Sequence, residues 1–140
     1  ACYANIWGYD FVFNMTADYT QQQKKKAPWL NFGAWNRVPQ SQALLHNYDW
    51  ILYGDLDHVF RDMSRPLESF LREFELYNQT PSVFLPTDNK PRHFTFSTYA
   101  YLIKNSPFGH SLLENWHKFA LGLCPKGNFP ATHRNGVLKY

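Results

Sequence analysis

Short apolar runs alternate with amphipathic stretches along this chain of 140 residues. The run Trp50–Tyr53 is continuously apolar between Asp49 and Gly54. Such a run is typical of a strand buried on both faces of a parallel sheet, so we place it at the centre of a sheet. Three further segments are strand candidates: Tyr9–Phe13, Ser82–Leu85 and Tyr99–Ile103.

Apolar residues at helical spacing predict three helices. The first covers Trp35–His46 and has an irregular first turn, because Pro39 is tolerated only near the start of a regular helix. The second has Ser64 as its N-cap and Pro66 in its first turn, and the third opens at Ser106-Pro107. Strands that alternate with helices indicate an α/β layered fold with a mainly parallel sheet, formed by residues 1–140 as a single domain.

Composition and charge exclude several classes of protein. The chain is 44% hydrophobic and 19% aromatic, which is too apolar for an intrinsically disordered protein. Its net charge is +3 and its cations form no stripe, so we expect no nucleic-acid partner. No run of residues reaches the roughly 18 apolar positions of a membrane span. The two cysteines, Cys2 and Cys124, are too few for a disulfide framework or a cysteine zinc site; they either pair or are both free.

Two carboxylates, Asp55 and Asp57, directly follow the most apolar predicted strand. Ligands bind at the carboxyl ends of strands in parallel sheets, and an i, i+2 spacing in extended backbone turns both side chains the same way. The pair can therefore share one divalent ion. Mg²⁺ or Mn²⁺ takes one or two protein carboxylates together with phosphate oxygens, which suits a nucleoside diphosphate. Aspartates after a strand also often only cap a turn, and that alternative stays open.

The run 48–60, Tyr-Asp-Trp-Ile-Leu-Tyr-Gly-Asp-Leu-Asp-His-Val-Phe, resembles the D-x-D region of GT-A glycosyltransferases. The closest match is to the galactosyltransferase, mannosyltransferase and xyloglucan xylosyltransferase family of retaining Golgi enzymes. Other segments resemble that family's pattern in the same order, over most of residues 3–120: Tyr3-Ala4 with Trp7–Phe11, Trp35–Pro39 with Leu44-Leu45, and Leu102–Ser106 with Leu112–Trp116.

The resemblance implies a Rossmann-like GT-A layer with a mainly parallel sheet. It implies a metal-dependent enzyme that moves a hexose or pentose from a UDP- or GDP-linked sugar to a glycan acceptor, with Mn²⁺ or Mg²⁺ as cofactor. A strand before Tyr3 and a later metal-binding histidine belong to the family pattern, so we expect a fragment that is incomplete at both ends. The expected location is the Golgi or secretory-pathway lumen, with a type II membrane anchor outside this segment.

The family pattern also assigns roles to single residues. Asp55 and Asp57 would hold the metal and the diphosphate. Arg37 matches a basic position and would favour the nucleotide's negative charge, or it is only a solvated helix residue. Asp88 would contact sugar hydroxyls, or it caps a turn. His58 would approach the phosphates, or it is a surface residue.

One element departs from the family pattern and motivates a second interpretation. Ser97 and Tyr99 stand where Asn and Gly are usual, and Tyr99 would fill the space that a glycine leaves for a ligand. The alternative function is therefore a non-catalytic GT-A-like module that binds carbohydrate or another partner. Asn14 and Asn78 each begin a glycosylation sequon, and use of either would place the protein in the secretory pathway.

Overall fold

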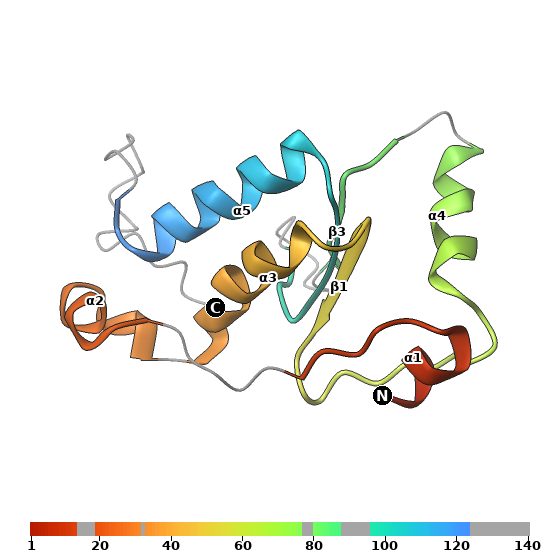
Figure 1. Ribbon diagram of the computed structural model, residues 1–140, viewed down its shortest axis with the longest axis horizontal. Coiled ribbons are helices and arrows are strands. Elements are labelled where there is room, and N and C mark those ends of the chain that lie inside the picture. Colours follow the sequence, from red (N-terminus) through yellow and green to blue (C-terminus); the bar gives the residue numbers. More distant parts are fainter. Residues whose placement is uncertain (14–18, 32, 77–79, 88–95, 124–140) are drawn as a thin grey trace.

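The computed structural model describes residues 1–13, 19–31, 33–76, 80–87 and 96–123 (Figure 1). The α-helices are α1 Cys2–Trp7, α2 Gln21–Lys26, α3 Arg37–Leu45, α4 Leu67–Glu75 and α5 Pro107–Ala120. Two 3₁₀ helices, η1 Pro28–Asn31 and η2 Gly33–Asn36, precede α3. The strands are β1 Trp50–Gly54, β2 Val83–Phe84 and β3 Ala100–Lys104. None of the helices in these ranges has the length and apolarity that crossing a membrane requires.

The three strands form one sheet in the order β1-β3-β2. β3 runs antiparallel to both neighbours, and its register with β1 extends from Trp50 opposite Lys104 to Gly54 opposite Ala100. β1 and β2 therefore point in the same direction on either side of β3. A mainly parallel sheet stays a prediction, since these short strands are the part of the sheet that the described residues form.

Among the described strands β3 is the central one and Trp50–Tyr53 lies at an edge, so its place at the centre of a larger sheet stays a prediction. Residues 100–103 are all buried, whereas residues 50–53 are only half-buried. The reason is that one side of β1 opens on a large cavity, described below. Within the described residues, the apolar run is covered by helix α3 and by the chain around that cavity, and its strand pairs along one edge.

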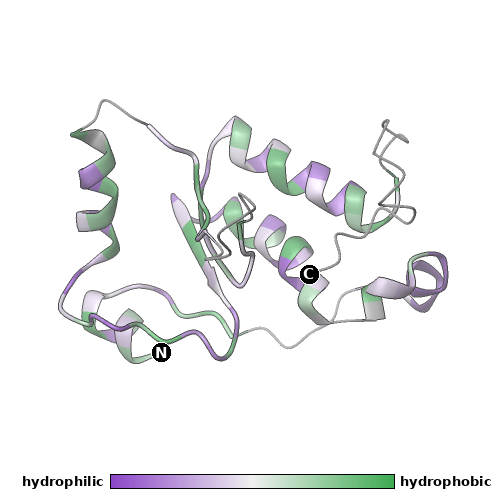
Figure 2. Cartoon of the chain, turned by 180° about the vertical axis from the view of Figure 1, so that it is seen from behind, coloured by the Kyte–Doolittle hydropathy of each residue, from purple (hydrophilic) through white to green (hydrophobic). Residues whose placement is uncertain are grey.

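The core lies between the sheet and two helices. α3 packs against both α5 and β1, and Figure 1 shows α3 and α5 together on one side of the strands. A cluster of fully covered side chains joins these elements: Leu45, Tyr101, Ile103 and Leu113. A second cluster lies below the end of α5: Tyr19, Ala27, Leu30 and Ala120. α2, built from three glutamines and three lysines, stays outside both clusters and is the purple helix of Figure 2.

Two of the three predicted helices begin as expected. The irregular turn before α3 is the 3₁₀ helix η2, after which the regular helix starts at Arg37. Ser106 caps α5, because its hydroxyl accepts a hydrogen bond of 3.1 Å from the Gly109 N–H, and Pro107 occupies the first turn. For α4 the predicted N-cap Ser64 is wrong. Its hydroxyl donates to Asp62 at 2.6 Å, and the helix begins later, after Pro66.

Two strand candidates are confirmed and one is wrong. Ser82–Leu85 contains β2, and Tyr99–Ile103 overlaps β3. Tyr9–Phe13 forms no strand. Its first residue is instead held by α4, where the Tyr9 hydroxyl accepts from the Leu67 N–H at 3.0 Å and donates to Glu68. The aromatic and β-branched residues after Tyr9 gave a strand pattern, but the segment lies beside the cavity without pairing to a described strand.

Replacing the cap of α5 tests the helix start directly. Ser106→Ala leaves the Gly109 N–H without its acceptor, so we expect the free energy of unfolding to fall by about 1 kcal/mol in denaturant titrations. Ser111→Ala, at an exposed position within the same helix, is the matched control: it removes a 3.3 Å surface hydrogen bond from Asn115 but gains helix propensity, so we expect a change below about 0.5 kcal/mol. Equal losses in the two variants would contradict the capping role.

Candidate functional site

The two aspartates of the D-x-D motif lie in a turn at the end of β1. The strand ends at Gly54, and the turn is closed by a hydrogen bond of 2.9 Å from the His58 N–H to the Asp55 carbonyl. The Asp55 N–H donates to the Tyr99 carbonyl at 2.8 Å, which ties the turn to the residue before β3. The expectation of extended backbone through both aspartates is therefore wrong, because the strand stops before the first of them and Asp57 lies in the turn.

The Asp55 side chain is held through one oxygen. Its Oδ1 accepts a hydrogen bond of 2.7 Å from the Tyr53 hydroxyl and forms an ion pair of 3.3 Å with Nη2 of Arg37. Burial, and next the hydrogen bond to Asp55, raise the pKa of the Tyr53 hydroxyl to about 12, so it stays a donor at neutral pH. Within the described residues Oδ2 has no partner, and the side chain is 32% exposed. One face of this carboxylate is thus fixed and the other is accessible.

Arg37, the first residue of α3, is buried at 7% exposure. Its guanidinium donates to the carbonyls of Ala34 and Thr98 and, at 3.3 Å, to the Thr98 hydroxyl. It also lies over the Tyr53 ring, with Cζ 5.1 Å from the ring centroid. The interpretation of Arg37 as a solvated helix residue is therefore wrong. The structure brings it to Asp55 instead.

Asp57 and His58 have different surroundings. Asp57 is exposed, and its carboxylate forms no hydrogen bond or ion pair with the described part of the chain. His58 is half-buried and packs against rings, with centroids 5.3 Å from Phe60 and 6.1 Å from Tyr99. A Cβ on Gly54 would lie only 3.2 Å from His58 atoms, so glycine allows the imidazole to fold back onto the strand end. These contacts describe a packed histidine, and its approach to phosphates stays a prediction.

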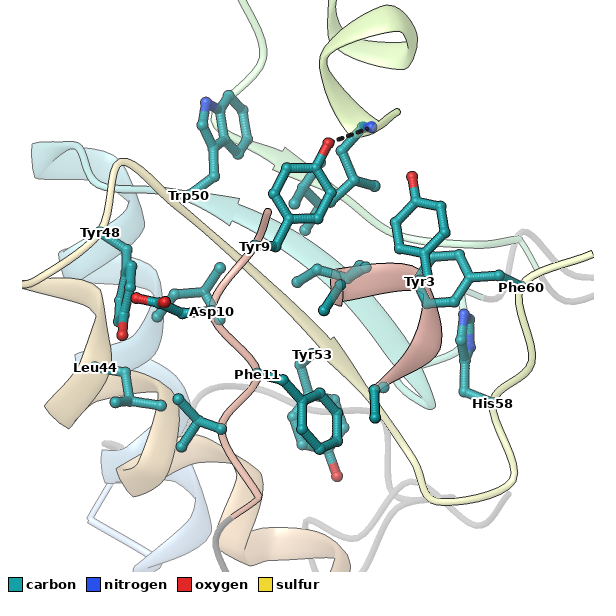
Figure 3. Close-up of a pocket in the computed structure, with 18 of the residues that line it drawn as sticks. Tyr3, Tyr9, Asp10, Phe11, Leu44, Tyr48, Trp50, Tyr53, His58 and Phe60 are labelled. Carbon is teal, nitrogen blue, oxygen red and sulfur yellow. Dashed lines mark hydrogen bonds between the residues drawn. The ribbon is translucent and has the colours of Figure 1, made fainter. Parts of the chain in front are cut away.

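A cavity of about 1200 Å³ borders the strand end. Its walls come from β1, from the chain around α1, and from the start of α4, and Asp55 and His58 belong to its lining. Figure 3 shows aromatic side chains around it: Tyr3, Tyr9, Phe11, Tyr53 and Phe60. Tyr3 stacks on Phe60 with ring centroids 3.8 Å apart. The cavity is therefore mainly apolar, with several aromatic rings, and its acidic groups lie near the end of β1, beside Tyr48 and at the start of α4.

A divalent ion at the two carboxylates would need further ligands. Among the described residues no group of three or more His, Cys, Asp or Glu side chains could hold a metal ion. The free Oδ2 of Asp55 and the exposed Asp57 carboxylate supply hard oxygen ligands of the type that Mg²⁺ and Mn²⁺ prefer. Phosphate oxygens and water would complete the coordination. Cys2 carries a free, exposed thiol, and Cys124 lies outside the described residues.

Three of the predicted site residues, one from the resemblance and two from the sequons, are not among those that the structure describes. Asp88 and the sequon asparagines Asn14 and Asn78 lie outside the described residues. The structure brings together Arg37 and Asp55, with Asp57 and His58 in the same turn.

Comparison with known proteins adds no relative. No family model, no curated protein and no solved structure matches this chain. The resemblance to D-x-D glycosyltransferases thus stays an interpretation of the sequence, and the function is argued from the site.

Two polar residues around the Arg37–Asp55 ion pair were missed in the sequence: Tyr53, which binds Asp55, and Thr98, which binds Arg37. Tyr53 stands two residues before Asp55, a spacing that places strand side chains on the same face. The sequence therefore contained a pattern that could have predicted this contact. For Thr98 there was no such pattern. It reaches Arg37 only because β3 pairs antiparallel with β1, which brings the residues before Ala100 beside the end of β1.

Proposed function

We propose that this chain carries the metal and diphosphate site of a GT-A-type glycosyltransferase. The enzyme would transfer a hexose or pentose from a UDP- or GDP-linked sugar to a glycan acceptor. The observation that supports this function is the carboxylate pair directly after β1, with Asp55 held by Arg37 and Tyr53 and with Asp57 exposed. A held carboxylate beside a free one suits a cation that arrives with a phosphate ligand.

Each residue of the site has a defined task in this proposal. Asp55 offers its free oxygen, and Asp57 can turn toward the same ion because no described contact restrains it. Tyr53 stays protonated and holds Asp55 in place. When bound, Mn²⁺ or Mg²⁺ supplies positive charge that neutralises the leaving diphosphate. Retention of the anomeric configuration comes from the family resemblance alone, and no side chain is assigned to the transfer step.

Hydrolysis of sugar nucleotides tests the proposal without knowledge of the acceptor. We expect the protein to hydrolyse at least one member of a panel of UDP- and GDP-hexoses and pentoses in Mn²⁺, and to lose this activity in EDTA. The nucleotide released identifies the donor class. Equal rates with Mn²⁺ and with EDTA would contradict a metal-dependent site.

A non-catalytic carbohydrate-binding module is the second candidate, and Tyr99 favours it. This side chain is 47% exposed and its ring lies 6.1 Å from His58, so it occupies space beside the aspartate turn where the family pattern has glycine. Exposed aromatic rings also stack well on sugars. Glycan binding that survives both EDTA and the Asp55→Asn/Asp57→Asn change would favour this candidate over the enzyme.

The proposal also places the protein in the cell. A glycosyltransferase of this type would act in the Golgi or secretory-pathway lumen, attached through a membrane anchor outside this segment. Its partners would be the nucleotide-sugar donor and the glycan acceptor. A glycosidase-sensitive mobility shift of the protein from its own cells would support that location through Asn14 or Asn78.

A further inference from the structure

We infer that Arg37 is a positioning residue for Asp55 and does not contact the nucleotide. The inference rests on the proposed metal site. It states that the Asp55 carboxylate is already held in its metal-binding orientation before the metal arrives. A buried arginine on the first turn of a helix needs an explanation, because an unpaired guanidinium would be costly at 7% exposure. Its contacts supply that explanation.

Every nitrogen of the Arg37 guanidinium has a partner within the protein. Nε donates to the Ala34 carbonyl, Nη1 donates to Thr98, and Nη2 pairs with Oδ1 of Asp55 at 3.3 Å. The Tyr53 ring covers one face of the group. At 7% exposure the residue also offers a phosphate little accessible surface. The planar guanidinium of Arg37 therefore links segments of the protein to one another.

The segments that Arg37 joins are the two that frame the aspartate turn. Asp55 follows β1 and Thr98 precedes β3. The next residue, Tyr99, accepts from the Asp55 N–H at 2.8 Å, so the same two segments are also joined through the backbone. Arg37 adds the side-chain link and connects both segments to the start of α3.

The consequence for Asp55 is a single side-chain orientation. Tyr53 and Arg37 both bind Oδ1, from the strand and from the helix respectively. Such fixed partners commonly orient metal-binding side chains, and their loss typically weakens metal affinity about 10- to 100-fold. Oδ2 is left for the cation. Arg37 thus determines which carboxylate oxygen the site offers.

Titration with Mn²⁺ alone separates this role from a phosphate contact. We would follow free Mn²⁺ by electron paramagnetic resonance in the wild type and in Arg37→Met, Arg37→Lys and Arg72→Met. Arg72 is an exposed arginine of α4 and provides the matched control. We expect Arg37→Met to weaken Mn²⁺ binding about tenfold. Arg37→Lys should also weaken it, because an ammonium keeps the charge but cannot reproduce the planar guanidinium.

Each outcome decides the inference. Unchanged or tighter Mn²⁺ binding in Arg37→Met would overturn the inference. If Arg37 served only to contact phosphate, removing its positive charge would reduce the repulsion of Mn²⁺ and leave the metal affinity unchanged or higher. If neither Arg37 variant shows native circular dichroism, Arg37 is a residue of the fold only, and the inference is also overturned. A wild type that binds Mn²⁺ only with UDP present contradicts a preformed carboxylate but retains the proposed function. A wild type that binds no Mn²⁺ under either condition overturns both.

Discussion

Asp57→Asn is expected to lower Mn²⁺-dependent sugar-nucleotide hydrolysis by about a hundredfold or more. The amide keeps the size of the side chain but removes the negative charge that attracts the metal and its diphosphate. Asp57 is exposed and forms no described contact, so the free energy of unfolding should stay within about 0.5 kcal/mol of the wild-type value. A loss of activity would therefore report on the site and not on the fold.

Asp49→Asn is the matched control for this prediction. Asp49 is an exposed carboxylate that lines the same cavity from the opposite end of β1, and its replacement changes the net charge of the protein by the same amount. We expect this variant to keep the wild-type rate in a steady-state assay at saturating Mn²⁺. A wild-type rate in Asp57→Asn, or equal losses in the two variants, would remove Asp57 from the site.

Gly109→Ala is expected to destabilise the protein by about 3 kcal/mol, although alanine favours a helix by about 1 kcal/mol over glycine. Gly109 is buried in the first turn of α5, where the helix meets the end of β3. An added Cβ would lie 2.1 Å from the Lys104 carbonyl oxygen and 3.4 Å from Ile103. Backbone atoms cannot yield as a flexible side chain does, so helix and strand must separate. Equilibrium unfolding in denaturant measures the loss.

Gly33→Ala separates this contact from a general effect of replacing glycine. Gly33 begins η2, and a Cβ there would meet no atom within 4 Å. We expect its free energy of unfolding to stay within about 0.5 kcal/mol of the wild-type value. If Gly109→Ala proves as stable as Gly33→Ala, the close packing of α5 on β3 is not as described.

Local sequence patterns were sufficient for most of the elements. The periodic apolar residues of α3, α4 and α5 predicted three helices, and Ser106-Pro107 fixed one start, because these signals act within a few residues. Ser64 was misjudged because Asp62 accepts the hydrogen bond of its hydroxyl and the helix begins only after Pro66. Strand position was harder. The apolar run Trp50–Tyr53 identified a strand but not its neighbours, which depend on pairing with residues about fifty positions away.

The candidate site was predicted in part. The position of Asp55 and Asp57 at the end of a strand followed from the boundary between apolar run and turn. The turn that contains Asp57 was not predicted, since the strand ends at Gly54 and the backbone is no longer extended beyond it. The burial of Arg37 was also missed. Its partner Thr98 is 61 positions away and joins it only through the folded sheet.

The most direct test of the metal and diphosphate site is a calorimetric titration of UDP into the wild-type protein and into Asp55→Asn/Asp57→Asn, each with Mn²⁺ and with EDTA. We predict that the wild type binds UDP in Mn²⁺ and much more weakly in EDTA, and that the double variant shows no difference between the two conditions. UDP binding that is equally strong in all four titrations would contradict the account, because the two carboxylates would then have no part in holding the diphosphate.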